Sequence, residues 1–323
     1  MSETEATEIT KTDEQKKAQF MKFLRLVLPL VGLVIIFSLF NVLTDGRMVS
    51  HVGLALSQVY VIMIASMGVF FIMTMGGLDF SQGSILGLSA ITVCALSEDY
   101  GIFFAVLGGM FIGALIGAIN GYFYVYRHIK SFIVTICTMF LFRGLIKYLT
   151  TNSPVAGSLD LIDLDTTAFK VTCTAVVVVL GFIAFSFTKF GTQLKAIGAG
   201  EKAAMFSGIS TDEVKFLVYV LAGAITGFAA FISAIKIGSV TSSGGNQLET
   251  QILIALVLGG MPISGGAMAR FGCFIVGSLL YVTLTSGLSM MGFSTQLMQL
   301  IEGCIFLVFV ALFADRQSLQ VIK

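Results

Sequence analysis

Few residues in this chain have side chains that could do chemistry, and the most informative of them follow a pair of glycines. Residues 76–84 (GGLDFSQGS) place a carboxylate and two hydroxyls directly after a turn that glycines permit. Asp79 and Ser81 could accept the backbone N–H bonds that such a turn leaves open, so that Asp79 caps the next helix. The alternative is direct hydrogen bonding of a polar solute. Both interpretations rest on hydrogen bonds, and neither involves covalent catalysis.

A second glycine string lies in residues 259–266 (GGMPISGG), which again combine Gly-Gly, a short spacer, serine and glycine. The two strings could mark equivalent places in two structural halves, as broken helices do in transporters with internal repeats. Residues 239–249 (SVTSSGGNQLE) form a further polar run, which is either a loop or the external mouth of a pathway for a hydroxyl-rich solute. The candidate pathway residues are Asp79, Phe80, Ser81, Asn120, Asn246 and Gln247.

Signatures of nucleotide hydrolysis and of metal or covalent catalysis are missing from the sequence. It contains no G-x-x-x-x-G-K-[ST] phosphate loop, no H-E-x-x-H and no G-x-S-x-G. His51 and His128 are far apart, and the five cysteines sit singly in apolar segments, which favours free thiols over disulfides or zinc. We therefore expect no catalytic residue, no metal site and no cofactor in this chain.

The composition is that of an all-α polytopic membrane protein. Of 323 residues, 56% are hydrophobic and 11% are charged, against roughly 25% charged in soluble domains. The net charge of +1 gives no reason to expect nucleic-acid binding. We expect about ten transmembrane helices, the third and eighth of them short and glycine-broken. Their expected limits are 23–43, 54–76, 83–97, 102–126, 131–149, 170–188, 214–236, 248–264, 271–289 and 296–314.

We expect one transmembrane domain, residues 23–314, between polar tails at residues 1–22 and 315–323. Most of the 19 lysines and arginines fall on the side of the N-terminal tail, so the positive-inside rule places both termini in the cytoplasm. This orientation also puts the polar segment 189–213 in the cytoplasm. Ser210 and Glu213 are predicted to form a capping box that starts the seventh span.

The polar segment 189–213 predicts a short helix of about two turns. Gly198 and Gly200 precede Glu201, and Gly208 ends the helix. Phe206 follows Ala203 by three residues, so the two share a face. Such a helix could lie on the lipid surface, or it could be the place where another protein pushes.

The fourth expected span carries four glycines spaced by four residues. They are Gly109, Gly113, Gly117 and Gly121. This spacing leaves one face of the helix nearly free of side chains, so that a second helix can approach closely. The second helix could belong to the same chain or to another subunit.

Five strings, in collinear order from about residue 50 to 315, resemble the membrane permease subunit of bacterial sugar ABC importers, the ribose/galactose/xylose permease family. Residues 76–90 (GGLDFSQGSILGLSA) resemble its G-G-[IL]-D-[LF]-S-x-G-S signature, and residues 131–144 (SFIVTICTMFLFRG) resemble its span that ends in Arg-Gly. Further similarities lie at 153–155 (SPV), 196–209 (AIGAGEKAAMFSGI) and 247–266 (QLETQILIALVLGGMPISGG).

The sequence departs from the family pattern at three places. Residues 198–200 (GAG) stand where the family has Gly-Gly-Asn, and residues 247–250 (QLET) stand where it has Tyr-Glu-Leu-Asp. Residues 265–268 (GGAM) replace its Gly-Gly-x-Gly. These differences suggest a divergent branch and weaken any transfer of the substrate.

The resemblance implies a permease that moves a monosaccharide or similar hydroxyl-rich solute by alternating access. It would be a multi-pass protein of the bacterial cytoplasmic (inner) membrane, in contact with lipid and paired with a second permease subunit, identical or related. An extracytoplasmic solute-binding protein would deliver the solute, and a partner ABC ATPase would use ATP and Mg. The residues that couple to this ATPase would be Gly200, Glu201, Ala203, Ala204, Phe206 and Gly208.

Two alternative transport functions stay open, and so does a structural scaffold in the membrane, which would show no solute uptake. Related permeases carry nucleosides or furanose-like signals, so the solute could be one of these. A stand-alone secondary transporter or channel is the alternative from another class. The segment 189–213 separates it from an importer, because only an ATP-driven importer needs an ATPase docking site there.

Overall fold

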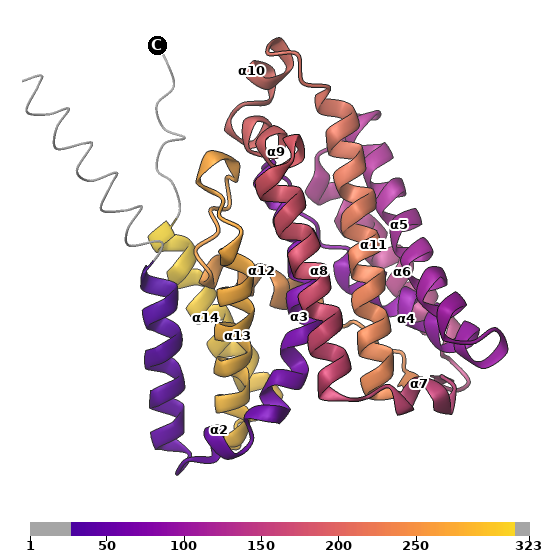
Figure 1. Cartoon of the computed structure of the whole chain (residues 1–323), viewed down its shortest axis with the longest axis vertical. Coiled ribbons are helices and arrows are strands. Elements are labelled where there is room, and N and C mark those ends of the chain that lie inside the picture. The colour runs from indigo at the N-terminus through magenta and orange to yellow at the C-terminus, as the bar shows by residue number, and fades with distance from the viewer. Residues whose placement is uncertain (1–26, 314–323) are drawn as a thin grey trace, which may run out of the picture.

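The computed structural model describes residues 27–313, and most of them are helical (Figure 1). The expected polar tails at 1–22 and 315–323 lie outside the described residues. The first described helix is Val27–Leu43. The later long helices are α3 (Val52–Thr74), α4 (Gln82–Asp99), α5 (Ile102–Val125), α6 (Ser131–Leu149), α8 (Thr167–Phe187), α11 (Thr211–Ile237), α13 (Gly272–Met290) and α14 (Thr295–Phe313). The short ones are α2 (Arg47–Ser50), α7 (Leu159–Asp163), α9 (Lys189–Ala199), α10 (Glu201–Phe206), α12 (Leu248–Leu258) and the 3-10 turn η1 (Gly266–Met268).

The prediction of an all-α membrane protein is confirmed. Among the described residues, six helices are long and apolar enough to cross a membrane: α3 over Leu56–Thr74, α5, α6, α8, α11 and α13. Val27–Leu43, α12 and Thr295–Ala311 are shorter apolar helices. Each expected span coincides with a helix, and the total of ten membrane crossings stays a prediction.

The third and eighth expected spans are not ordinary membrane helices. α4 is 18 residues long, but it carries several polar side chains and neighbouring helices bury most of it. α12 has only 11 residues and ends at Leu258, so the expected limit at residue 264 was wrong. Crossing a bilayer takes about 20 residues. Gly260, with a φ of 86°, ends α12, and irregular backbone leads on to α13.

The two glycine strings end their helices in the same way. Gly76 follows α3 with a φ of 83°, and Gly260 follows α12 with a φ of 86°. In both places the next residue donates its backbone N–H to the carbonyl five residues earlier, at 3.0 Å. This is the Schellman motif, which needs a left-handed residue that glycine supplies without strain. The same bond also follows Gly208 at the end of α10, so the equivalence of the two strings stays a hypothesis.

The glycine stripe of α5 faces α11 of the same chain. A Cβ atom built on Gly113 would overlap the carbonyl oxygen of Gly223, and one on Gly117 would overlap that of Tyr219. α5 and α11 therefore touch backbone to backbone. Lipid supplies no hydrophobic force that drives helices together, so close packing of this kind stabilises the pair.

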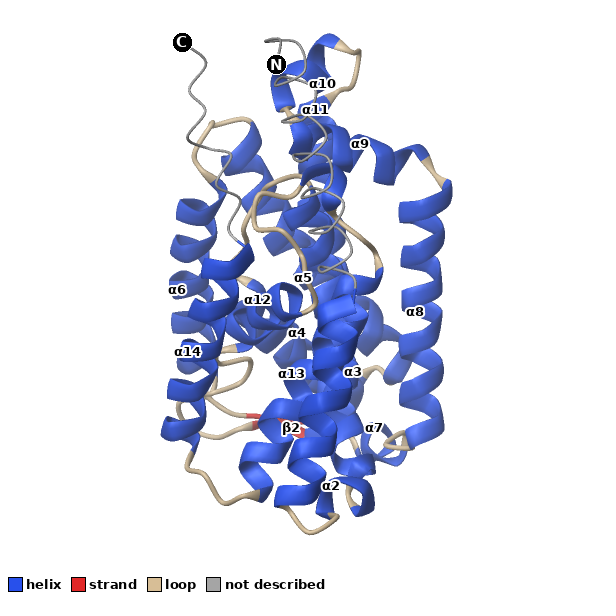
Figure 2. Ribbon diagram, turned by 90° about the vertical axis from the view of Figure 1, so that its left-hand side faces the viewer, coloured by secondary structure: helices blue, strands red, loops and turns tan. Residues whose placement is uncertain are grey.

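The end of the molecule opposite α10 carries the only two strands among the described residues. β1 (Val155–Ala156) and β2 (Ser239–Val240) pair antiparallel near α7 (Figure 2). They join the loop after α6 to the loop after α11. Residues 239–247 therefore form the loop between α11 and α12, and we call this side of the molecule the α7 end.

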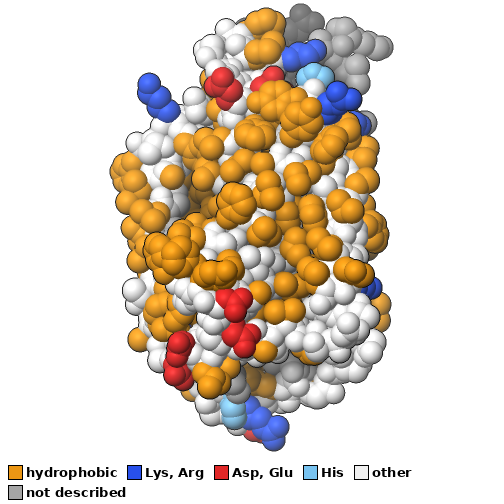
Figure 3. All heavy atoms as spheres, turned by 90° about the vertical axis from the view of Figure 1, so that its right-hand side faces the viewer, with side chains coloured by type: hydrophobic (Ala, Val, Ile, Leu, Met, Phe, Trp, Pro, Cys, Tyr) orange, Lys and Arg blue, Asp and Glu red, His pale blue; other side chains and the backbone are white. Residues whose placement is uncertain are grey.

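The surface has the pattern of a protein that lies in lipid. Hydrophobic side chains cover the middle of the face shown in Figure 3, whereas Lys and Arg side chains gather toward its two ends. Large apolar side chains such as Phe111, Phe140 and Leu307 are exposed. Soluble monomers rarely expose apolar patches wider than a few hundred Å². The apolar middle therefore faces hydrocarbon.

The contact between α5 and α11 predicts that Gly113→Ala is destabilising. The added methyl group forces the two backbones apart, and overpacking of this kind costs about 1–3 kcal/mol. We expect a lower unfolding temperature of the purified protein in detergent. Gly144→Ala in α6 is the matched control, because nothing lies within 4 Å of the position of its Cβ. Equal unfolding temperatures for the two variants would contradict the close contact.

Candidate functional site

Asp79 holds the turn that precedes α4. Its carboxylate accepts hydrogen bonds from the backbone N–H of Ser81 at 2.8 Å, from the Ser81 hydroxyl at 2.6 Å and from Nε2 of Gln82 at 2.7 Å. Asp79 is only 1% exposed, so these donors replace water. Asp79 thus orders the turn just before α4, and the expected helix cap was wrong, because its backbone bond goes to Ser81 and not to the first N–H groups of α4.

A buried polar network spreads from Asp79 to three further helices. The Ser81 hydroxyl accepts from Nδ2 of Asn120 in α5 at 2.8 Å, and Oδ1 of Asn120 accepts from Thr138 in α6 at 2.7 Å. Thr226 in α11 donates to Gln82. We call Asp79, Ser81, Gln82, Asn120, Thr138 and Thr226 the Asp79 network. It fixes the start of α4 against α5, α6 and α11, because the loss of any hydrogen bond leaves a buried polar group without a partner.

Three of the six candidate pathway residues are members of the Asp79 network. Asp79, Ser81 and Asn120 are buried and bonded to one another, while Phe80 is half-buried. In this structure they hold helices together, and direct contact with a solute stays a prediction for them.

An ion pair joins α6 to the start of α12. Nη2 of Arg143 lies 3.2 Å from both carboxylate oxygens of Glu249, and Arg143 also donates to Oδ1 of Asn246. A Cβ atom on Gly83 would overlap the carboxylate of Glu249, so α4 passes directly beside the pair. The candidate residue Asn246 thus lies on the surface and binds Arg143.

A polar cavity of about 470 Å³ lies toward the α7 end, among α3, α11, α12, α13 and α14. We call it the outer polar cavity. Its polar lining residues are Ser57, Gln58, Lys236, Gln247, Gln251, Tyr281, Thr285, Ser286, Ser289, Thr295, Gln299 and Glu302. Of the six candidate pathway residues, Gln247 alone belongs to this lining. Carboxylate, amide and hydroxyl groups together can both donate to and accept from a hydroxyl-bearing solute.

Two hydrogen bonds order the wall of the outer polar cavity. Oε2 of Glu302 accepts from the Tyr281 hydroxyl at 3.2 Å, and Nε2 of Gln299 donates to Oε1 of Gln247 at 2.8 Å. Among the residues that the structure describes, no group donates to the other carboxylate oxygen of Glu302. That oxygen is available to a ligand.

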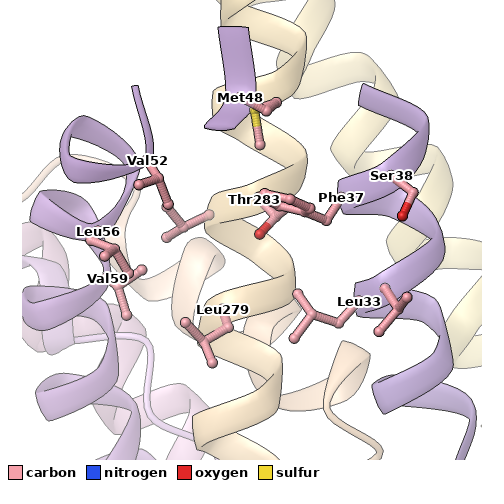
Figure 4. Close-up of a pocket in the computed structure, with 11 residues that line it drawn as sticks. Leu33, Phe37, Ser38, Met48, Val52, Leu56, Val59, Leu279 and Thr283 are labelled. Atoms are coloured by element: carbon pink, nitrogen blue, oxygen red, sulfur yellow. The ribbon is translucent and has the colours of Figure 1, made fainter. Parts of the chain in front are cut away.

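A second cavity, of about 310 Å³, lies between the first described helix, α2, α3 and α13 (Figure 4). Its walls are mainly apolar and include Leu33, Phe37, Val52 and Leu279. A hydroxyl-rich solute would lose its hydrogen bonds to water there and gain few in return. The outer polar cavity is therefore the better candidate for a sugar-like ligand.

At the opposite end, α10 is the short helix that the glycines predict. Gly208, with a φ of 83°, ends it, and Ile209 donates to the carbonyl of Ala204 at 3.2 Å. Phe206 is 84% exposed, and Met205 beside it is also exposed. Ala204 is only 4% exposed in the single chain, and its part in coupling to the ATPase stays a prediction. Its methyl group lies on the side of α10 that packs on the rest of the chain.

Lys215 ties α10 to α11. Its Nζ atom lies 2.5 Å from Oε1 of Glu201 and 3.5 Å from Oδ1 of Asp212. The predicted capping box is absent, because the Ser210 side chain makes no cap bond to the start of α11. The ψ of Ser210 is 76°, which is short of the extended angle that aims a cap hydroxyl at the first turn.

α9 rests on the end of α3 and on the second glycine string. A Cβ atom on Gly198 would overlap the carbonyl oxygen of Thr74 at the end of α3, and it would crowd the backbone N of Gly266. The position therefore requires glycine. Gly200 has an extended φ of 172°, which any residue can adopt. This explains why a departure from the family pattern is tolerated at residues 199–200 while Gly198 is kept.

The outer polar cavity could not be found by reading single motifs. Its signal in the sequence is spacing, since Tyr281, Thr285 and Ser289 recur every four residues in the apolar helix α13. Thr295, Gln299 and Glu302 form a similar row in α14. A row at this spacing lies on one face of a helix.

Comparison with known proteins identifies the class of this chain. The model of the family "Branched-chain amino acid transport system / permease component" matches residues 52–310. The chain therefore belongs to this family of membrane permeases.

Individual relatives lie among the sugar permeases. The ribose import permease protein of Bacillus subtilis is 31% identical, over 94% of this chain and 97% of its own length. The xylose transport system permease protein of Haemophilus influenzae is 24% identical, over 88% and 94% of the two chains. The D-allose transport system permease protein of Escherichia coli is 26% identical, over 79% and 80%. No solved structure matches the chain.

The Asp79 network predicts that Asp79→Asn is destabilising. The substitution keeps the size of the side chain but turns one acceptor into a donor among groups that all donate to it. We expect a loss of about 1–3 kcal/mol, measured as a lower unfolding temperature in detergent. Asp45→Asn is the control, because Asp45 is exposed and lies outside the network. A variant at position 79 as stable as this control would contradict the assignment.

Proposed function

We propose that this chain is the transmembrane permease subunit of an ATP-driven ABC importer, which moves a monosaccharide or similar hydroxyl-rich solute into the cytoplasm by alternating access. The observation that carries the proposal is the outer polar cavity within a bundle of mostly apolar membrane helices. Membership of the permease family supports it, and so do the ribose, xylose and allose permeases among the relatives.

The outer polar cavity suits a neutral solute that carries several hydroxyls. Its volume of about 470 Å³ lies in the range of small-molecule sites, which is about 300–1,000 Å³. The available oxygen of Glu302 accepts from a hydroxyl, while Gln251 and Thr285 can donate or accept. Because the cavity is ringed by apolar helices, these groups have few other partners.

A second permease subunit would complete the cavity. Gln299 and Gln247 in its wall are exposed at the surface of the single chain. Polar side chains that face hydrocarbon are costly and face protein or water in almost all membrane proteins. A second copy or a related chain against α12 and α14 would shield them and enclose the solute path between two subunits.

The partner ATPase would dock at α10, which would lie on the cytoplasmic side. Phe206 offers an exposed aromatic anchor there, next to Met205. The chain itself has no phosphate loop, so ATP and Mg would be bound by that partner. A solute-binding protein would deliver its cargo to the α7 end on the other side of the bacterial cytoplasmic membrane.

Reconstitution tests the proposed function. The chain, its ATPase and its solute-binding protein are assembled in proteoliposomes and offered radiolabelled D-ribose, D-xylose, D-allose and uridine. We expect ATP-dependent uptake of at least one of the three sugars. Uptake of uridine alone would show that the transported solute is a nucleoside and not a sugar. Uptake that needs no ATPase would refute an importer in favour of a stand-alone transporter.

Docking at α10 predicts that Phe206→Asp releases the ATPase. A charge at the centre of an apolar contact removes the anchor, and truncation of such anchors costs 2 kcal/mol or more, roughly a 30-fold loss of affinity. Co-purification of the ATPase measures this. Leu159→Asp is the matched control, since Leu159 is 79% exposed in α7 at the opposite end. Loss of the ATPase from both variants, or from neither, would contradict docking at α10.

Solute recognition predicts that Glu302→Ala slows uptake. Removal of a hydrogen bond to a charged group costs about 1.5–3 kcal/mol, roughly a 10- to 150-fold loss in uptake at low solute concentration. Co-purification of the ATPase should be unchanged. Glu98→Ala, an exposed carboxylate at the end of α4, is the control. Unimpaired uptake in Glu302→Ala would show that this carboxylate does not bind the solute.

A further inference from the structure

Four side chains form a continuous path of contacts from α10 to the turn before α4. They are Glu201, Lys215, Tyr124 and Tyr219. They come from α10, α11 and α5, and the path ends beside the Asp79 network. Its three links are an ion pair, a pair of ring contacts through Tyr124, and a hydrogen bond.

The first link is the ion pair of Lys215 with Glu201 at 2.5 Å. Lys215 is only 6% exposed, so its ammonium has little access to water. Separation of α10 from α11 would leave a buried charge without its nearest partner, which is strongly unfavourable. Lys202, on the same short helix, is exposed and makes no ion pair or hydrogen bond within the described part of the chain. Glu201 and Lys215 therefore give α10 a buried polar connection to α11 that Lys202 does not provide.

The second link crosses from α11 to α5 and back. Nζ of Lys215 lies 5.1 Å from the centre of the Tyr124 ring, within the range of about 6 Å for a cation–π contact. The Tyr124 ring lies 5.6 Å from the ring of Tyr219, one turn further along α11. Tyr219 is fully buried. A shift of Lys215 thus acts through the half-buried Tyr124 ring on the Tyr219 ring, which is closely packed on all sides.

The third link reaches the turn before α4. The Tyr219 hydroxyl donates to the carbonyl of Leu78 at 3.4 Å, and the Leu78 N–H donates to the Ser131 hydroxyl at 3.3 Å. A Cβ atom on Gly77 would come within 3.2 Å of the same phenol oxygen. Leu78 precedes Asp79 directly. The phenol therefore holds the backbone of the turn whose carboxylate organises the Asp79 network.

We propose that Lys215 and Tyr219 are positioning residues that transmit a displacement of α10 to the turn before α4. The Asp79 network then passes it to α4, α5 and α6. The direction of this transmission rests on the proposed docking of an ATPase at α10. The mechanical connection itself depends only on the contacts within this chain.

Hydrogen exchange of the full chain in lipid nanodiscs tests the connection without any solute. Lys215→Met, Tyr219→Phe and the double variant are compared with wild type, with Lys202→Met as the control on the same helix. We expect the backbone amides of residues 77–82 to exchange roughly 2- to 30-fold faster in both single variants. The double variant should be no faster than the faster single variant, because both substitutions cut one path.

Two outcomes overturn the proposal. One is an equal rate of amide exchange at residues 77–82 in Lys215→Met and in the control Lys202→Met. The other is a double variant whose effect equals the product of the two single effects, because the residues would then act independently. Lys215→Arg keeps the charge and should exchange as wild type does. Tyr219→Phe removes a single oxygen, so it carries the test even where Lys215→Met does not fold.

The assembled importer gives a functional readout. Lys215→Met should keep the ATPase bound and should lower the amount of solute transported per ATP hydrolysed. Unchanged coupling in this variant would contradict transmission from α10. A wild-type complex without ATP-dependent uptake would refute the proposed function, whereas the exchange experiment would still decide whether the contact path exists.

Discussion

The carboxylate of Asp79 is the constraint on which the rest of the structure depends. It is buried among apolar helices, where water is not available to satisfy it, so every hydrogen bond to it has to come from the chain. The turn after α3 supplies these donors, and Ser81 and Gln82 carry the network on to α5, α6 and α11. α11 can come close enough to take part only because its backbone and that of α5 meet at glycines. The position of the central helix α4 is thus set by polar groups, while the lipid sets only the apolar exterior.

α11 connects the two ends of the molecule. Its 27 residues give a length of about 40 Å, which is enough to cross the whole hydrocarbon layer. Lys215 holds α10 near its first turn, Thr226 joins the Asp79 network in its middle, and Lys236 lines the outer polar cavity near its last turn. A rigid helix with these three attachments can carry a movement from the proposed docking site at α10 to the proposed solute site in the outer polar cavity. Alternating access needs such an element.

The sequence predicts the parts of this arrangement that depend on local physics. Apolar runs mark helices because hydrocarbon leaves the backbone few other choices, and the glycine at 208 marks the end of α10 because its φ is positive. The burial of α4 was not predictable from hydropathy, since neighbouring helices decide it, and the early end of α12 was missed although Gly260 marks it. The outer polar cavity was missed because its residues come from five helices that are distant in sequence. The partner of Lys215 was missed for the same reason, because the fold alone brings Glu201 to it.

The central claim is that the outer polar cavity is a solute path controlled from the α10 end. Its most direct test uses Thr285→Cys, on the cavity wall, in a background without the five native cysteines. The rate of labelling by a membrane-impermeant thiol reagent is measured in the assembled complex, with and without ATP and with and without the transported sugar. We predict that the sugar slows labelling and that ATP changes its rate, while a cysteine on the exposed surface of α7 responds to neither. Labelling at position 285 that is indifferent to both would contradict the claim.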